Sequence, residues 1–434
     1  MLEKTWLVAR AVGNIGAFIG YLISRSIWLR MRRIRHRLFS SPEHADHRQR
    51  NIVVVGASMA GYHAAKTIAE ALLPGLPYQV VVVEPHDHFH FTWVLPRFSV
   101  VEGHEHKAFI PYGPYLRKLP DGVLKWIQGC AIRITKDKVH LKSGEEIPYE
   151  FLVVATGAGA ADALPSRVDA DDKTEGIAKL RGLQTKIKDA KNLVVVGGGA
   201  AGVELATDAK SLYSEKTVVL VHSRDNVMHR FGAELQKAAM DGLKNLGINV
   251  ITGDRLIGED RGRGVVKLRS GREVKCDFLV NCAGQKPNSA LIAELSPGSI
   301  TSTGHILVKP TMQIDDDLLP NVYVCGDVAE THTPNPNSRT ARGQATVAAD
   351  NVILAIDGKQ PANKYSPQWL EGLIKLTLGL DKSVTHVGDF SGTELLFPSK
   401  EKDVALMAGG AWRHMGATPF QEDAVALQRF VTQP

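Results

Sequence analysis

Short runs of consecutive apolar residues recur along the chain, and most of them end close to a glycine. Two runs, at 52–55 and 193–196, each lead into a glycine-rich turn and then into a helical pattern. Apolar runs of this length without polar alternation predict strands buried on both faces of a parallel sheet. Further runs lie at 80–83, 151–154, 218–221, 278–280 and 322–324. The pattern therefore predicts an α/β fold.

The two glycine-rich turns, at 56–61 and 197–202, each stand between a strand and a helix. In such a unit the first glycine permits a sharp turn, the second lets backbone approach a pyrophosphate, and the third lets helix pack on strand. The helix N-terminus then offers free N–H groups to the phosphates. The candidate positions are Gly56, Ser58, Ala60 and Gly61 in the first turn and Gly197, Gly199 and Gly202 in the second. Two such turns predict two dinucleotides, held by two Rossmann-like domains.

The residues that follow each unit separate the two nucleotides. Glu84 ends the strand after the first turn, 23 residues past Gly61, where a carboxylate can bind the ribose hydroxyls of an adenosine. This position favours FAD. The equivalent strand of the second unit runs into Ser223 and Arg224 instead of an acid. Because these side chains could bind a 2′-phosphate, NADPH is at least tolerated, and the choice between NADPH and NADH stays open.

Two later strand ends add candidate cofactor contacts. The run at 151–154 ends in Ala155, Thr156 and Gly157, and the run at 322–324 is followed by Gly326 and Asp327. A glycine and an aspartate after a strand are by themselves typical of a turn. Their order after two nucleotide units favours contacts with a flavin dinucleotide.

As a set, these motifs resemble the signature of the pyridine nucleotide-disulfide oxidoreductase superfamily. The chain is most similar to its apoptosis-inducing-factor-like branch, the AMID or ferroptosis-suppressor type, and more distantly to type II NADH dehydrogenases. The resemblance covers roughly residues 51–415. It implies an FAD domain with an inserted NAD(P)H domain and a small C-terminal α+β domain, with Glu84 and Asp327 holding FAD. It also implies that Glu204, the catalytic candidate, lies beside the nicotinamide and the flavin.

The resemblance predicts the reaction. We expect a hydride to pass from NAD(P)H to FAD, and electrons then to pass to a quinone-type acceptor at a membrane. The alternative is a cell-death or signalling flavoprotein that turns NAD(P)H over slowly and has a binding role.

Three details depart from this pattern or compete with it. Ser58 replaces the usual glycine or alanine, and its turn distantly resembles a hydrolase nucleophile elbow, a reading that leaves the second glycine-rich turn unexplained. The family's C-terminal Trp-Lys pair, thought to touch the flavin, becomes Trp412 and Arg413. Alternating histidines at 86, 88 and 90 lie in a loop beside the expected FAD ribose, and we expect no metal there.

The cysteines limit which superfamily chemistry is available. The chain has four, Cys130, Cys276, Cys282 and Cys325, and no Cys-x-x-Cys or Cys-x-x-x-x-Cys pair follows the first unit. A dithiol reductase is therefore not expected.

The order of the motifs predicts five segments. They are a hydrophobic and basic leader at 1–49, a first part of the FAD domain at 50–162, an NAD(P)H domain at 163–289, a second part of the FAD domain at 290–356, and a C-terminal domain at 357–434.

Residues 1–50, the leader and the first residue after it, carry ten lysines and arginines against three acids, a net charge of +7, whereas the whole chain is +6. The body is thus near neutral, which removes the compositional reason to expect nucleic-acid binding. Between residues 5 and 29 the only charges are Arg10 and Arg25. The uncharged span between them is short for crossing a bilayer, so a spanning helix, a helix lying on the membrane surface and a mitochondrial presequence all stay open.

We favour membrane attachment, at the mitochondrion or, alternatively, at another intracellular membrane facing the cytosol. Gly16 and Gly20 could allow close helix contact, and a homodimer stays open.

Overall fold

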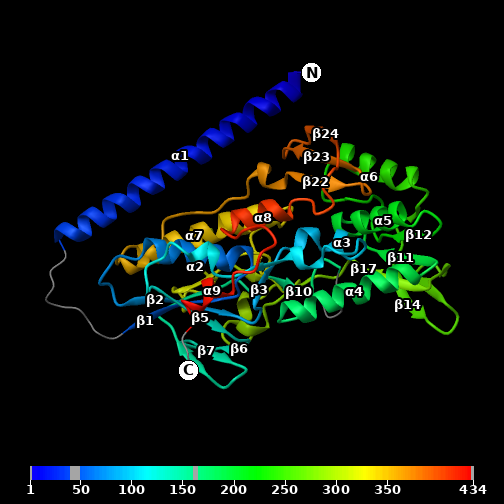
Figure 1. Cartoon of the computed structure of the whole chain (residues 1–434). Helices are drawn as coiled ribbons and strands as arrows, with labels where there is room; N and C mark the ends of the chain where they lie inside the picture. Colours follow the sequence, from blue (N-terminus) through cyan, green and yellow to red (C-terminus); the bar gives the residue numbers. More distant parts are fainter. Residues whose placement is uncertain (1, 40–48, 160–164, 432–434) are drawn as a thin grey trace.

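The computed structural model describes residues 2–39, 49–159 and 165–431, and its centre is a five-stranded parallel sheet (Figure 1). The strands follow the order β20-β9-β1-β2-β5, with β1 in the middle. Their bounds are β1 (Arg50–Val55), β2 (Tyr78–Glu84), β5 (Leu124–Gln128), β9 (Phe151–Val154) and β20 (Val322–Val324). Val53 and Val54 of β1 are fully buried, as a parallel sheet covered on both faces requires.

A second parallel sheet has the order β13-β12-β11-β17. Its strands are β11 (Asn192–Val196), β12 (Thr217–Val221), β13 (Asn249–Ile251) and β17 (Phe278–Asn281). All four lie between β9 and β20 in the chain, so the second sheet is inserted into the first. The prediction of two parallel sheets at these apolar runs is confirmed.

The helices that follow the glycine-rich turns are α2 (Met59–Ala71) and α5 (Ala200–Leu212). The sequence pattern suggested helices from residues 61 and 202, and both begin two residues earlier. A further helix of this part is α7 (Ser338–Ile356), which packs against α2. It begins at Ser338, where Asn337 and Thr340 form a capping box. The other helices of this body are α3 (Leu95–Phe98), α4 (Lys173–Asp189) and α6 (Ala233–Asn245).

Short strands and 3₁₀ helices lie outside the two large sheets. The strands are β3 (His88–His90), β4 (Phe109–Pro111), β6 (Ala131–Ile134), β7 (Lys138–Leu141), β8 (Glu146–Pro148), β10 (Ala158–Gly159), β14 (Leu256–Asp260), β15 (Val265–Leu268), β16 (Glu273–Lys275), β18 (Lys286–Pro287), β19 (Ile306–Leu307) and β21 (Ala329–Glu330). The 3₁₀ helices are η2 (Thr92–Val94), η3 (Glu105–Ala108), η4 (Pro114–Leu116), η5 (Ala290–Ile292), η6 (Pro297–Ser299) and η7 (Trp369–Gly372).

The C-terminal part is a small α+β unit. An antiparallel sheet of β22 (Ile374–Thr377), β23 (Lys382–Gly388) and β24 (Glu394–Lys400) is followed by α8 (Ala408–His414) and α9 (Ala424–Gln428). The boundary expected between residues 162 and 163 lies outside the described residues, and the other domain boundaries stay predictions.

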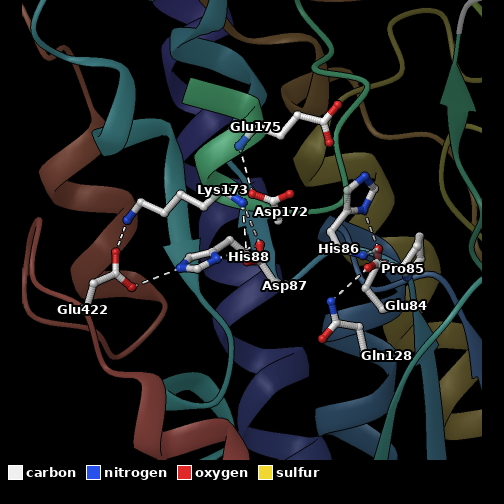
Figure 2. Close-up of polar contacts among 10 residues, drawn as sticks. All are labelled: Glu84, Pro85, His86, Asp87, His88, Gln128, Asp172, Lys173, Glu175 and Glu422. Carbon is white, nitrogen blue, oxygen red and sulfur yellow. Dashed lines mark hydrogen bonds and ion pairs between the residues drawn. The ribbon is translucent and has the colours of Figure 1, made fainter. Parts of the chain in front are cut away.

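A polar cluster joins the C-terminal segment to the loop and short strand that follow β2 (Figure 2). His88 on β3 lies between two carboxylates, with Nδ1 2.8 Å from Asp87 and Nε2 3.0 Å from Glu422. Lys173 binds Glu422 through its ammonium group and Asp87 through its backbone N–H. Asp172 caps α4 by accepting from the backbone N–H of Glu175 at 2.8 Å. The cluster therefore joins α4, the loop after β2 and the end of the chain.

The leader forms one long helix, α1 (Leu2–Phe39), which runs along one side of the body (Figure 1). Its segment Thr5–Leu38 is long and apolar enough to cross a membrane, because it contains an 18-residue window with a mean hydropathy of 1.5. A signal sequence near an N-terminus would pass the same test, so length and composition alone do not decide its role.

Candidate functional site

The two glycine-rich turns open into one cleft. Its volume is about 1730 Å³, and its walls come from both large sheets, from the start of α7 and from the C-terminal unit. Nearly all residues predicted as site residues line it. These are Gly56, Ser58, Ala60, Glu84, Ala155, Thr156, Gly157, Gly197, Gly199, Glu204, Ser223, Arg224 and Asp327.

The two remaining predicted residues, Gly61 and Gly202, are buried beneath the turns. A Cβ on Gly61 would lie 1.8 Å from the carbonyl oxygen of Gly56, and one on Gly202 would lie 1.9 Å from that of Gly197. Gly56 and Gly197 themselves have φ of +92° and +111°, where a side chain is strained. Only glycine therefore lets each helix start so close to the preceding turn, with its N-terminus toward the cleft.

Glu84 lies at the end of β2, with both carboxylate oxygens partly used. Its Oε2 accepts from the backbone N–H of Ala57 at 2.5 Å, and its Oε1 lies 2.5 Å from Nδ1 of His86 (Figure 2). Burial alone would lower the pKa of His86, but the hydrogen bond and charge of Glu84 outweigh it and raise that pKa. The backbone N–H of His86 also donates to Oε1, at 3.0 Å. Since a carboxylate has about four acceptor positions, Glu84 keeps about one for a hydroxyl donor.

Contacts between the ends of β9 and β18 shape the wall between the two turns. The hydroxyl of Thr156 donates to the carbonyl of Asn288 at 2.7 Å, and the Asn288 amide donates back to the carbonyl of Thr156. Across the cleft, Asp327 lies 3.5 Å from the guanidinium of Arg167, and both side chains are half-buried. Arg167 was not among the sequence candidates, because nothing near it in the chain marks it as a cleft residue.

The second turn is surrounded by basic side chains. Ser223 and Arg224 follow β12 as predicted, and both are exposed. Arg230 and Arg255 line the same part of the cleft, and sequence reasoning missed them because they follow no motif. His222 lies beneath, where its Nδ1 accepts from the backbone N–H of Gly198 at 3.0 Å. Burial lowers the pKa of His222, which favours the neutral ring that this acceptor role requires.

Glu204 projects from the first turns of α5 and connects the second sheet with the C-terminal unit. Its Oε1 accepts from the backbone N–H of Thr377 at 3.0 Å and from the Thr377 hydroxyl at 3.2 Å. Burial, together with the charge of Asp208 one helical turn away, raises the pKa of Glu204 to about 7. The carboxyl group is therefore partly protonated near neutral pH.

A buried ion pair lies behind Glu204. Nε of Arg97 on α3 donates to Asp208 at 2.6 Å, and the other side of the guanidinium donates to the carbonyl of Gly379 at 3.0 Å. The side chains of Arg97 and Asp208 are 1% and 0% exposed. Removing one partner of such a pair costs about 3–5 kcal/mol, because the other charge stays buried alone.

One sequence-based suggestion does not fit the cleft. Trp412 and Arg413 do not line it: Trp412 is buried, its indole N–H donates to the carbonyl of Lys107 at 2.9 Å, and Arg413 is exposed. The packing of α8 onto η3 thus turns this pair away. In the described part of the chain, no group of three His, Cys, Asp or Glu side chains is arranged to hold a metal ion.

Comparison with known proteins identifies this architecture. Residues 50–360 match the family model described as pyridine nucleotide-disulphide oxidoreductase. The chain belongs to this family. It is 34% identical over 362 residues to Fe-regulated protein 8 of Mycosarcoma maydis, an alignment that covers 77% of this chain and 88% of that protein. It is 29% identical to ferroptosis suppressor protein 1 of Xenopus tropicalis, over 85% of this chain and 96% of the relative.

Among solved structures, the sulfide:quinone oxidoreductase of Aquifex aeolicus matches with a TM-score of 0.67. The match has 16% identity and covers 85% of this chain and 92% of that one. At this identity the likeness concerns the fold alone, and it confirms the predicted Rossmann-type architecture.

The family uses FAD with NAD(P)H, so the chain is an FAD-dependent NAD(P)H oxidoreductase. The cleft fits this chemistry. It is large enough for two nucleotides, each turn begins and ends with a glycine that no other residue could replace without strain or a clash, and a carboxylate ends β2.

The raised pKa of Glu204 makes stability depend on pH. The native carboxyl holds its proton up to about pH 7, whereas the ordinary glutamate value is 4.5. Between these values the native state binds more protons than the unfolded chain, so this group lowers stability as pH rises. Replacing Glu204→Gln should therefore raise the unfolding midpoint more at about pH 8 than at about pH 5, measured by thermal denaturation. Glu215→Gln on the exposed surface is the matched control, and an equal shift at both pH values would contradict the raised pKa.

Proposed function

We propose that this protein is a membrane-associated NAD(P)H:quinone oxidoreductase. The observation that carries the proposal is a second cavity of about 120 Å³ beside the main cleft. The two share the lining residues Arg230, Phe231, Asn335 and Gly372. The far wall of the small cavity includes Trp369 and Asp389, the two residues that Arg10 of α1 contacts.

This arrangement supports an electron acceptor that enters the cleft from the side on which α1 lies. The small cavity adjoins both the cleft and α1, and Phe231 and Phe390 contribute aromatic surface to it. An apolar ring such as a quinone suits a passage of this kind. One solved structure with the same fold is named as a sulfide:quinone oxidoreductase, which agrees with the proposal while sharing only the fold.

The proposed roles follow the order of the motifs. The first turn, Glu84 and Asp327 hold FAD, and the second turn holds the pyrophosphate of NAD(P)H. Ser223 and Arg224, with Arg255 nearby, bind the 2′-phosphate when the donor is NADPH. Glu204 orients the nicotinamide. When bound, FAD supplies the redox chemistry by accepting a hydride and releasing electrons to the acceptor.

The first test is an anaerobic absorbance titration of the purified protein with NADH and with NADPH, followed by a short-chain quinone. We expect the flavin absorbance to bleach with either donor and to return promptly when the quinone is added. A flavin that is reduced and then stays reduced with quinone present would contradict quinone reductase activity. It would favour instead the slow-turnover signalling flavoprotein.

The two turns should be separable by matched substitutions. Gly61→Ala places a Cβ against the Gly56 carbonyl and should give a protein that lacks flavin absorbance. Gly202→Ala should keep its flavin but lose reduction by NAD(P)H, because the equivalent clash distorts only the second turn. Gly182→Ala, on the exposed face of α4 with no atom near the added Cβ, is the control. Loss of flavin in the Gly202→Ala protein would contradict the assignment of the two sites.

The basic side chains near Ser223 predict selectivity for the donor. Arg224→Ala should raise the KM for NADPH by roughly ten- to a hundredfold, the expected size of one charge-assisted contact, and change that for NADH little. Steady-state kinetics with both donors measure it, and Arg261→Ala, on the exposed β14–β15 turn, is the control. An equal loss with both donors would contradict the phosphate assignment.

A further inference from the structure

Two charged side chains in the first three quarters of α1, Arg10 and Arg25, bind carboxylates of the body. The guanidinium of Arg10 donates to Asp389 at 2.6 Å. Arg25 forms a bidentate pair with Asp350 on α7, with its closest contact at 2.8 Å. These are the only two charged residues between positions 5 and 29. The middle of the helix therefore presents no charge to its surroundings.

Further arginines of α1 bind the body at the other end of the helix. Arg32 binds Asp357, just past the end of α7, at 2.5 Å, and it also donates to the carbonyl of Ala71 at the end of α2. Arg33 donates to the carbonyl of Glu70 at 2.8 Å. Only 8% of Arg32 is exposed, so this contact is part of the packed surface.

The spacing of these contacts fixes the direction of the helix. Arg10 and Arg32 are 22 residues apart, which is about 33 Å along a helix and roughly the thickness of a bilayer core. Because the body holds both points, α1 lies along the body throughout that length (Figure 1). A crossing helix would have to release these pairs or draw the body into the hydrocarbon, and Asp350, whose side chain is 4% exposed beneath α1, would lose its arginine partner.

The opposite face of α1 is apolar and exposed. Its exposed large apolar residues in the first three quarters of the helix are Val8, Val12, Ile15, Ile19, Leu22, Ile23 and Ile27. An uninterrupted apolar surface of this extent is unusual on a soluble protein and marks an interaction site. The face needs a partner that is itself apolar and extended.

The charge of the last quarter of the helix indicates which partner that is. Arg30, Arg35 and Arg37 are exposed there, between the exposed apolar residues Met31, Ile34 and Leu38. Apolar and basic side chains mixed on one exposed face are typical of helices that lie in the headgroup region of an anionic membrane.

We propose that α1 lies in the plane of an anionic membrane, held to the body by its arginines and embedded in lipid by its opposite face, and that it does not cross the bilayer. The proposal rests on the proposed membrane association and deepens it by giving the orientation. The body then sits on the membrane along α7 and β24, with the small cavity beside Trp369 facing the same side.

The test uses the full-length protein on sealed phosphatidylcholine vesicles with and without phosphatidylserine. In a Cys130→Ser background, which removes the exposed cysteine, Lys4→Cys and Arg37→Cys place one thiol near each end of α1. We expect co-flotation that is stronger with phosphatidylserine, and labelling of both thiols by a membrane-impermeant maleimide added outside. A Lys4→Cys thiol that reacts only after detergent would show a crossing helix and overturn the proposal, while membrane association would stand.

The apolar face is tested separately. The double variant Ile19→Glu, Ile23→Glu should bind vesicles at least roughly tenfold more weakly and keep its activity with a short-chain quinone. Ile257→Glu, an exposed apolar residue on β14, is the matched control and should bind as the parent does. A full-length protein that never floats with vesicles would overturn both membrane proposals. Equal binding to vesicles by the parent and the double variant would overturn the role of this face in lipid binding. A parent that is a dimer, does not float with vesicles and dissociates when the two substitutions are made would overturn it as well.

Discussion

The buried guanidinium of Arg97 links the three parts of this molecule. Arg97 comes from α3, which follows the first nucleotide unit, and its partner Asp208 comes from α5 of the second. Its other contact, the carbonyl of Gly379, belongs to the C-terminal unit. The cleft is formed by these same three parts, which this one side chain links. Glu204 lies one helical turn before Asp208, and its raised pKa is a consequence of the same burial.

The sequence predicts best what depends on local sterics. Gly61 and Gly202 could be recognised because each must avoid a backbone oxygen only five residues earlier in the chain. Glu84 and Asp327 could be placed because the ends of parallel strands meet at one edge of a sheet. The starts of α2 and α5 were predicted less well, since neither has a side-chain cap that would mark its first residue in the sequence.

What the sequence could not predict depends on contacts between distant segments. Arg167, Arg230 and Arg255 reach the cleft only through the tertiary fold. The acids that bind Arg25 and Arg32 each lie 325 residues further along the chain. The resemblance placed Trp412 and Arg413 near the flavin, but the packing of α8 buries Trp412 and exposes Arg413. A motif carried over from relatives predicts a position in the chain more reliably than a direction in space.

The helix α7 connects the cleft to α1, the helix that we propose lies on the membrane. Its first turn lines the cleft with Ser338 and Arg339, and Asp350 and Asp357 at its other end bind α1. This helix of 19 residues, about 28 Å long, thus has the cleft at its first end and its contacts with α1 toward its other end. A shortened protein made without α1 would expose two carboxylates, Asp350 and Asp357, that are normally paired with arginines. It would be an electrostatically altered enzyme, not simply a soluble version of the same one.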